Sequence, residues 1–394
     1  MSHQLISRST DLKKLRDEGY DIAIRSGHLI VRQVPYVNSG KKICFGTLIS
    51  KLTLAGDITA KPDDHVAFFE GEYPCHVDGT AIEQFRSGTE RYNLGQDLCA
   101  SHRFSAKPIS GGYANYYDKI TNYEAILSGP AQDIDPSVTA KTFPVIEAKE
   151  DESVFNYIDT ASSRAGINVV TNKLELGRVA IVGLGGTGSY ILDLIVKTPV
   201  KKIHLFDGDK FLQHNAFRSP GAASSEELQE KLAKTTYFER IYSKMRKGIC
   251  GHPYFIDASN VDQLRDMNFV FLCLDSGEAR QRIVEKLEEF SIRFIDVGMG
   301  VEESNGSLCG ILRISTSTPE KREHVWVNKR IPFSEDGGNN EYNLNIQIAD
   351  LNALNAALAV IKWKKMFGFY HDLEKEHFSA YTIDGNDLMN EEKS

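Results

Sequence analysis

The stretch RVAIVGLGGTGS, residues 178–189, decides the fold of this chain. It is a short apolar strand that runs directly into a glycine-rich turn. Residues without a β-carbon let the backbone turn sharply and approach a phosphate, and the helix that follows directs free N–H groups at the anion. We therefore expect a nucleotide site in which the backbone of four glycines holds phosphate: Gly183, Gly185, Gly186 and Gly188.

The residues that follow predict a Rossmann-like half. Residues 189–195 continue as the helix, and residues 202–206 form a second strand that ends on Asp207. Asp207 comes about twenty residues after the glycines, where an acidic side chain meets a ribose hydroxyl. The glycine pattern alone also marks dinucleotide-dependent oxidoreductases, so the residues further along the chain must decide between the two kinds of site.

The segment after Asp207 favours a triphosphate over a dinucleotide. A ribose needs one carboxylate, whereas this segment adds a second acid, Asp209, an amide, Asn215, and a guanidinium, Arg218. A guanidinium can bind phosphate oxygens with two parallel hydrogen bonds. The alternative is a polar loop that contains a salt bridge.

The rest of the second half alternates helices and strands. Residues 224–247 are predicted as one helix that carries Lys231 and Lys234, and a strand at 269–274 stops at Asp275. A carboxylate at the carboxyl end of a parallel strand is well placed for Mg²⁺. A strand at 294–296, a flexible Gly298-Met299-Gly300 and a strand near 311–313 complete a doubly wound sheet.

Taken together, these residues resemble the ThiF/MoeB family of adenylyltransferases, which has the fold of the ubiquitin-activating enzymes. The resemblance covers residues 162–370 and rests on a set of motifs in order and at similar spacing. The set comprises the glycine turn, Asp207-x-Asp209, Asn215-x-x-Arg218, a lysine on the following helix, and Asp275 with Arg280 after a strand.

The resemblance implies roles for individual residues. Gly186 and its neighbours would hold the phosphates of ATP, Asp207 the ribose and Asp275 a Mg²⁺ ion, and Lys234 fits the family helix better than Lys231. The family joins a carboxylate, usually the C-terminal glycine of a ubiquitin-like protein, to AMP and releases pyrophosphate. The catalytic residues implied are Arg218, Lys234, Asp275 and Arg164, the last reaching the ATP of a dimer partner; Asn215, with His214 alongside, would contact phosphate and Ser276 the adenosine.

The chain also departs from the family. It lacks the two Cys-x-x-Cys pairs of the family zinc site, so no zinc is expected, and the loop at 333–344 contains no cysteine. We expect that loop to be mobile. A thioester at the usual place is therefore in doubt: the adenylate passes directly to a nucleophile of another protein, or Cys309 or Cys75 serves. Cys309 is more simply interpreted as buried structure, and Cys75, beside His76, as a half-buried turn residue.

Length and composition predict two domains. The 394 residues divide into an N-terminal α+β domain, 1–149, and an adenylation domain, 150–394, whose α/β fold is a Rossmann-like, doubly wound, mostly parallel sheet. The six scattered cysteines indicate reduced thiols, and the absence of an apolar run or a signal peptide indicates a cytoplasmic protein. A net charge of −8 argues against nucleic acid or membrane as partner.

The function expected from the resemblance is ATP-dependent adenylation of the C-terminal carboxylate of a ubiquitin-like protein in a bacterial conjugation pathway. The enzyme would be a homodimer, and its N-terminal domain would select a partner such as a conjugating enzyme. Three alternatives remain open: adenylation of a sulfur-carrier protein or peptide, a non-catalytic nucleotide-binding scaffold, and NAD-dependent oxidoreduction.

Overall fold

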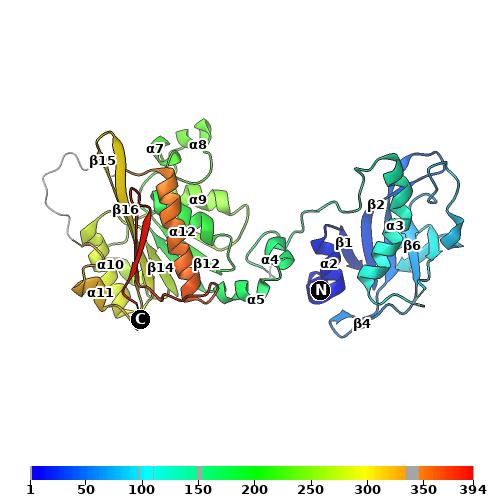
Figure 1. Cartoon of the computed structure of the whole chain (residues 1–394), viewed down its shortest axis with the longest axis horizontal. Helices are drawn as coiled ribbons and strands as arrows, with labels where there is room; N and C mark the ends of the chain where they lie inside the picture. Colours follow the sequence, from blue (N-terminus) through cyan, green and yellow to red (C-terminus); the bar gives the residue numbers. More distant parts are fainter. Residues whose placement is uncertain (1, 96–97, 110, 149–152, 334–345, 394) are drawn as a thin grey trace. The chain divides into compact units, whose positions relative to one another are not determined.

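The computed structural model describes residues 2–95, 98–109, 111–148, 153–333 and 346–393 (Figure 1). The chain divides into two compact units, residues 1–146 and 147–394. The predicted domain boundary at 149/150 lies outside the described residues, and so does almost all of the predicted loop at 333–344. No helix in the described ranges is both long and apolar enough to cross a membrane.

The first unit is an antiparallel sheet packed against helices. The sheet has the order β1-β2-β3-β6-β10-β7, and the long helix α3 packs on β2. Two short hairpins, β4-β5 and β8-β9, accompany it. The elements are α1 Ser2–Arg8, α2 Thr10–Asp17, β1 Ile22–Arg25, β2 His28–Val37, β3 Ile43–Lys51, β4 Leu54–Ala55, β5 Ile58–Thr59, β6 Val66–Glu70, β7 Arg86–Gly88, β8 Tyr92–Gly95, β9 Leu98–Ala100, β10 His102–Ser105 and α3 Tyr116–Ile134. This is the α+β architecture expected of the first domain.

The second unit contains an eight-stranded mixed sheet with the order β13-β12-β11-β14-β15-β16-β17-β18. The five strands from β13 to β15 are parallel, and β16, β17 and β18 add an antiparallel extension. The strands are β11 Arg178–Val182, β12 Lys202–Phe206, β13 Ile249–His252, β14 Phe269–Leu272, β15 Phe294–Ser304, β16 Ser307–Ser317, β17 Phe378–Thr382 and β18 Asp387–Glu391. The predicted α/β class is confirmed.

Helices cover both faces of this sheet because side chains alternate along each strand. Val179 and Ile181 of β11 join one buried cluster with α6, α9 and α12, whereas Ala180 and Val182 join another with α10 and α11. Figure 1 shows α12 and α10 on opposite sides of β14. The helices are α4 Thr160–Arg164, α5 Asn168–Thr171, α6 Gly186–Ile195, α7 Gln213–Ala216, α8 Ser225–Gln229, α9 Lys234–Tyr242, α10 Gly277–Glu289, α11 Glu323–Val327 and α12 Ala349–Met366. The sheet is therefore doubly wound.

The prediction of a single helix at 224–247 is wrong, because the structure has two helices there. α8 ends at Gln229 and α9 begins at Lys234, and between them Lys231 adopts a left-handed φ of 48°. The segment between the helices is tied to the loop after β12: the N–H of Phe211 donates to the carbonyl of Leu232, and that of Lys234 to the carbonyl of Asp209. These tertiary hydrogen bonds override local helix propensity and place Lys234 at the start of a helix.

The prediction that Gly298-Met299-Gly300 is flexible, made from its glycines, is also wrong. All three residues lie within β15, where they pair with Arg313, Leu312 and Ile311 of β16. The antiparallel partner holds the glycines in an extended conformation that their composition does not favour.

His204 on β12 gives a testable pH dependence of stability. Burial, with smaller effects from His252, Arg178 and Lys202, lowers the pKa of His204 to about 4. The unfolded chain binds this proton near pH 6.5, so between 6.5 and 4 the unfolded state holds more protons than the folded one. We expect the free energy of unfolding to fall as pH drops through this window, by less than about 3 kcal/mol because the ring is only partly buried.

Urea denaturation between pH 7.5 and 4 checks this expectation. His204→Gln should flatten the pH profile, while His76→Gln, at an exposed ring, should leave it unchanged. Identical profiles for the parent and His204→Gln would contradict the assignment.

Candidate functional site

A cavity of about 760 Å³ opens at the carboxyl edge of the parallel strands. Its wall is built from the turn after β11, the ends of β12 and β14, and the middle of β15. The predicted site residues that line it are Gly183, Gly185, Gly186, Gly188, Asp207, Asp209, Arg218, Lys234, Asp275 and Ser276. The tertiary structure therefore brings most of the predicted set to one place, although their roles remain predictions.

The glycine turn is closely packed at three positions and open at one. A β-carbon on Gly183, whose φ is +94°, would lie 2.3 Å from the carbonyl oxygen of Cys273, and one on Gly188 would lie 2.0 Å from that of Gly183. One on Gly186 would lie 2.0 Å from Nδ2 of Asn352. Gly185 has nothing within 4 Å of its β-carbon position and caps α6 without a side-chain hydrogen bond. The first residues of α6, Gly186 to Gly188, line the cavity, and no side chain caps the helix, as an anion site requires.

Asp207 organises the turn. It is 5% exposed, its Oδ2 accepts from the N–H of Leu184 at 2.7 Å, and its Oδ1 accepts from the N–H of Asp209 at 2.8 Å. Both oxygens are therefore already engaged by the backbone. The side chain of Asp209 is 58% exposed, which makes it the better placed of the two acids for a ribose.

Lys234 lines the cavity and pairs with both acids of the Asp207-x-Asp209 motif. Its Nζ is 2.7 Å from Oδ2 of Asp209 and 3.4 Å from Oδ2 of Asp207, and the residue is 5% exposed. Lys231 is exposed and does not line the cavity. The break between α8 and α9 produces this difference, because it makes Lys234 the first residue of α9.

Arg218 and Asp275 are charged groups without protein counter-ions in the described residues. The buried Nε of Arg218 has no hydrogen-bond partner there, although the side chain lines the cavity. Asp275 is exposed three residues beyond the end of β14, and Ser276 next to it caps α10. A buried donor without an acceptor is costly unless a ligand supplies one, so Arg218 is available to a ligand. Asp275 is available because it is exposed and has no ion pair among the described residues.

Three predicted residues do not line the cavity. Asn215 is buried, and its Oδ1 accepts from the N–H of Leu212, so it stabilises the turn at α7. His214 is exposed. Arg164 is exposed at the end of α4, which leaves its predicted role toward a dimer partner a prediction.

The sequence analysis missed two residues of α12, of which Asn355 lines the cavity and Asn352 contacts the glycine turn. Asn352 of α12 accepts from the hydroxyl of Thr187 at 2.9 Å, and Asn355, one turn later, donates from Nδ2 to the carbonyl of Gly298 at 3.1 Å. Their i, i+3 spacing on a helix and their full burial are the signals that could have pointed to them.

The sequence analysis named Arg280 but missed that it belongs to a buried group of three charges. Asp296, which is fully buried, lies 3.1 Å from Nε of Arg280 and 2.6 Å from Nη2 of Arg313. Arg280 also donates to the carbonyls of Leu274 and Pro332. One carboxylate thus shares two guanidinium groups, leaving a net positive charge at the cavity wall.

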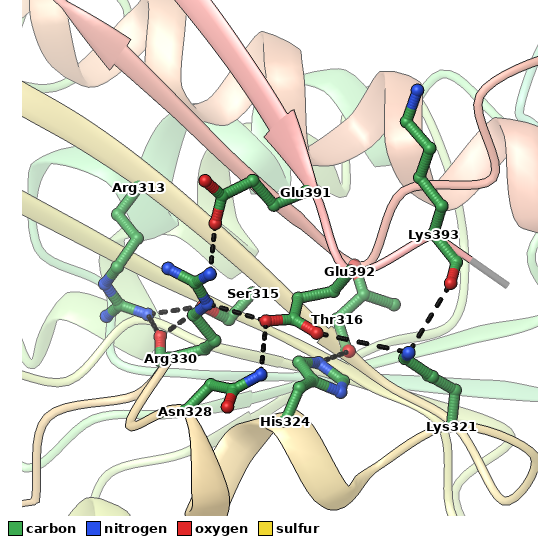
Figure 2. Close-up of polar contacts among 10 residues, drawn as sticks. All are labelled: Arg313, Ser315, Thr316, Lys321, His324, Asn328, Arg330, Glu391, Glu392 and Lys393. Atoms are coloured by element: carbon green, nitrogen blue, oxygen red, sulfur yellow. Dashed lines mark hydrogen bonds and ion pairs between the residues drawn. The ribbon is translucent and has the colours of Figure 1, made fainter.

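Figure 2 shows how the segment near Arg330 is held. Nη1 of Arg313 and Oγ of Ser315 donate to the carbonyl of Arg330, whose guanidinium binds Glu391 and Glu392 of the C-terminal segment. Asn328 also donates to Glu392. This network holds the backbone at Arg330, whose carbonyl accepts a hydrogen bond from Arg313.

The two thiols considered as nucleophiles are not activated. Burial raises the pKa of Cys75, which is 2% exposed. Burial and the nearby Glu302 raise the pKa of Cys309, which is only partly buried, so its interpretation as buried structure is wrong. Cys99 on β9 is partly exposed, with Nη2 of Arg91 3.9 Å from its Sγ.

In the part of the chain that the structure describes, no three His, Cys, Asp or Glu side chains form a metal-binding group.

Two family comparisons cover most of the chain. Residues 160–331 match the ThiF family, and residues 10–160 match a family described as a domain of unknown function, DUF6791. The chain also aligns with ubiquitin-like modifier-activating enzyme 5 of Aedes aegypti, at 26% identity over 160 residues, and of Culex quinquefasciatus, at 24% over 170. Each alignment covers 38% of this chain and 40% of the relative, so the chain matches less than half the length of these relatives.

Solved structures with a similar arrangement include E. coli MccB and PaaA. MccB has 17% identity and a TM-score of 0.45, over 60% of this chain and 68% of that one. PaaA has 16% identity and a TM-score of 0.43, over 57% of this chain and 75% of that one.

Proposed function

We propose a function for this chain from one premise, which is that its residues 160–331 match the ThiF family. The relatives with which the chain aligns include ubiquitin-like modifier-activating enzymes. The proposed activity is ATP-dependent adenylation of the C-terminal carboxylate of a polypeptide. The observation that supports it most is the meeting of Arg218, Lys234 and Asp275 with an open glycine turn around one cavity.

The residues present fit a triphosphate. The N–H groups of α6 are not capped by a side chain, the space at Gly185 is open, and the buried Nε of Arg218 has no acceptor among the described residues. Mg²⁺ is bound in proteins by one or two carboxylates together with substrate phosphates, which is the role available to Asp275. Bound there, the ion would neutralise phosphate charge.

The chemistry balances without a covalent enzyme intermediate. A carboxylate oxygen of the acyl substrate forms a bond to the α-phosphorus, the bond from that phosphorus to the bridging oxygen of the β-phosphate breaks, and pyrophosphate leaves. Arg218 and Lys234 would bind the phosphate oxygens on which negative charge increases. Asp207 would hold the glycine turn in position through the N–H of Leu184.

We further propose that the acyl substrate is a ubiquitin-like protein, that the pathway is a bacterial conjugation pathway, and that residues 1–146 select a partner such as a conjugating enzyme. The relatives named as ubiquitin-like modifier-activating enzymes support the first of these. A homodimer would bring Arg164 of each chain to the ATP of the other. A peptide substrate is the second candidate, since MccB has been crystallised with the peptide MccA.

Exchange of labelled pyrophosphate into ATP tests the activity. We expect exchange when a ubiquitin-like protein with a free C-terminal glycine is added, and none when that terminus is amidated. Asp275→Asn should abolish the exchange. The proposal is wrong if the parent protein shows no exchange with any acyl substrate and is stabilised by NAD but not by ATP with Mg²⁺.

Phe255 gives a prediction about the base. Its ring is 58% exposed, lines the cavity and lies where a β-carbon on Gly208 would come within 2.6 Å of Cδ2. Gly208 separates the two acids of the Asp207-x-Asp209 motif, so a ribose bound at Asp209 brings its base beside this ring. Stacking of a base on an aromatic ring contributes about 1–3 kcal/mol.

Phe255→Ala is therefore expected to weaken ATP binding about 5- to 150-fold, the change that 1–3 kcal/mol corresponds to. Calorimetric titration with ATP and with inorganic triphosphate checks it, because triphosphate affinity should not change. Phe217→Ala, at another exposed ring, is the matched control. Equal ATP affinity in Phe255→Ala and the parent would place the base elsewhere.

A further inference from the structure

Asp296 is a buried carboxylate to which the proposed chemistry gives no role. Side chains alternate along β15, so Ile295 and Val297 join the buried cluster with α6 and α12, whereas Phe294 joins the cluster with α10. Asp296 lies on the same face as Phe294, is fully buried, and is not among the residues that line the cavity. A buried carboxylate is costly unless it is paired, so its partners indicate what it does.

Arg280 is the partner that α10 supplies. Its Nε lies 3.1 Å from Oδ1 of Asp296, an ion pair whose two atoms are not aligned as a hydrogen bond. Arg280 is 6% exposed and lies at the end of the first turn of α10, where the helix dipole disfavours a positive charge. The carboxylate of Asp296 offsets both the dipole and the loss of solvent, so it stabilises the guanidinium in this position.

The guanidinium of Arg280 reaches back beyond the start of its own helix. Side chains on a helix lean toward its N-terminus, and Nη2 of Arg280 donates to the carbonyl of Leu274. Nη1 donates to the carbonyl of Pro332 at 2.9 Å. Arg280, Leu274 and Pro332 all line the cavity. One side chain thus joins the segment that follows β14 to the segment that follows α11.

The segment that follows β14 carries Asp275. The carboxylate of Asp275 is exposed and has no ion pair among the described residues, so its direction depends on the backbone on either side. On one side Ser276 caps α10 by accepting from the N–H of Ala279, at a long 3.5 Å. On the other side Arg280 binds the carbonyl of Leu274. A charge-assisted hydrogen bond is the stronger of the two, so Arg280 is the main anchor of this segment.

We propose that Asp296 is a positioning residue that acts on Asp275 through Arg280. The buried carboxylate holds the guanidinium, and the guanidinium holds the carbonyl of Leu274, which directs Asp275 at a metal ion bound to the triphosphate. The inference rests on the proposed function, in which Asp275 binds Mg²⁺, and it names a residue outside the cavity on which the affinity for that ion depends. Groups that hold a metal-binding carboxylate affect metal affinity although they do not touch the ion.

Arg313 offers an internal comparison, because it binds the same carboxylate from β16. Its Nη2 donates to Oδ2 of Asp296 at 2.6 Å, and its Nη1 donates to the carbonyl of Arg330 at 2.8 Å, a contact that Figure 2 shows. Loss of either guanidinium takes one partner from a buried carboxylate and destabilises the fold. Only the loss of Arg280 also releases Leu274, so stability and positioning can be measured separately.

Binding of a non-hydrolysable ATP analogue tests the positioning role without turnover. Calorimetric titrations at increasing Mg²⁺ give the Mg²⁺ concentration at which half of the gain in affinity is reached, and titration in EDTA gives the affinity of the metal-free analogue. In Asp296→Asn and Arg280→Gln this Mg²⁺ concentration should rise about 10- to 100-fold. Affinity in EDTA should stay within about twofold of the parent, because the donors to phosphate are unchanged. Mn²⁺ bound in the same complex, counted by electron paramagnetic resonance, should decrease in parallel.

Two controls separate positioning from stability. Arg313→Gln should lower the melting temperature and keep the Mg²⁺ dependence of the parent. Arg282→Gln, at an exposed arginine of the same helix that pairs with Glu278, should change neither. Circular dichroism melting shows which variants fold. If Asp296→Asn does not fold, Arg280→Lys replaces it, because an ammonium keeps the charge but lacks the fork that binds two carbonyls, and it should shift the Mg²⁺ dependence in the same direction.

The positioning role is wrong if folded Asp296→Asn and Arg280→Lys keep the Mg²⁺ dependence of the parent. It is also wrong if Arg313→Gln shifts that dependence equally, since the network would then act only on stability. Failure of the adenylation proposal looks different: the parent would show no pyrophosphate exchange, while the Mg²⁺ dependence of analogue binding would still report on Asp296. A parent with equal affinity for the analogue in Mg²⁺ and in EDTA would remove the metal from Asp275 and overturn the positioning role as well.

Discussion

Arg218→Ala is expected to lower the rate of pyrophosphate exchange by about 10²–10³-fold, the effect of removing one donor that stabilises charge in a transition state. The protein should remain folded, because the guanidinium has no ion pair among the described residues and its buried Nε has no hydrogen-bond partner there. Removing an unsatisfied donor costs the folded state little. The melting temperature should therefore equal or exceed that of the parent.

The controls for Arg218 separate charge from position. Arg218→Lys keeps the charge without the two-pronged geometry and should recover part of the rate. Lys231→Ala removes an exposed lysine that does not line the cavity and should leave the exchange unchanged. An Arg218→Ala protein with the exchange rate of the parent would remove this residue from the site.

Gly188→Ala is expected to lower the stability of the fold, whereas Gly185→Ala is expected to lower only the affinity for ATP. A β-carbon on Gly188 would lie 2.0 Å from the backbone oxygen of Gly183 and 3.2 Å from Cβ of Cys273, so Gly188→Ala must displace packed backbone. We expect a loss of about 1–3 kcal/mol in the free energy of unfolding. A β-carbon on Gly185 meets nothing within 4 Å, so Gly185→Ala should melt like the parent.

The methyl group of Gly185→Ala enters the space assigned to phosphate. ATP affinity should fall at least tenfold even though the fold is unchanged, because close approach of the backbone to the anion is blocked. Thermal melting and calorimetric ATP titration of the two variants measure the two effects separately. If Gly185→Ala binds ATP as tightly as the parent, the turn is not the phosphate site.

The position of Lys234 shows why the sequence analysis, which preferred this lysine because of the family resemblance, still predicted the wrong helix. Residues 224–247 have a continuous helical composition, yet the backbone of Leu232 accepts a hydrogen bond from Phe211, and the chain breaks between α8 and α9. That contact joins segments 21 residues apart in the sequence, which a helical pattern cannot reveal. The break is what makes Lys234 the first residue of α9.

Asp207 also shows what local sequence cannot predict, which is the set of hydrogen-bond partners of a side chain. Its place after a strand pointed to a ribose carboxylate, but the strand position alone does not say which donors the carboxylate meets. In the fold it accepts from the N–H groups of Leu184 and Asp209, so its first role is to shape the glycine turn. Asp209, two residues later, pairs with Lys234 through one oxygen but is the more exposed of the two acids.

The sequence by itself determined the glycine turn, the acids at the ends of β12 and β14, and the resemblance to the ThiF family, because these depend on residue type and short spacing along one strand, turn and helix. Only the tertiary structure decided how α12 and β16 complete the cavity: Asn355 and Arg313 meet at Gly298 from segments 42 residues apart. Such convergence depends on strand register and helix packing, which no local pattern in either segment encodes.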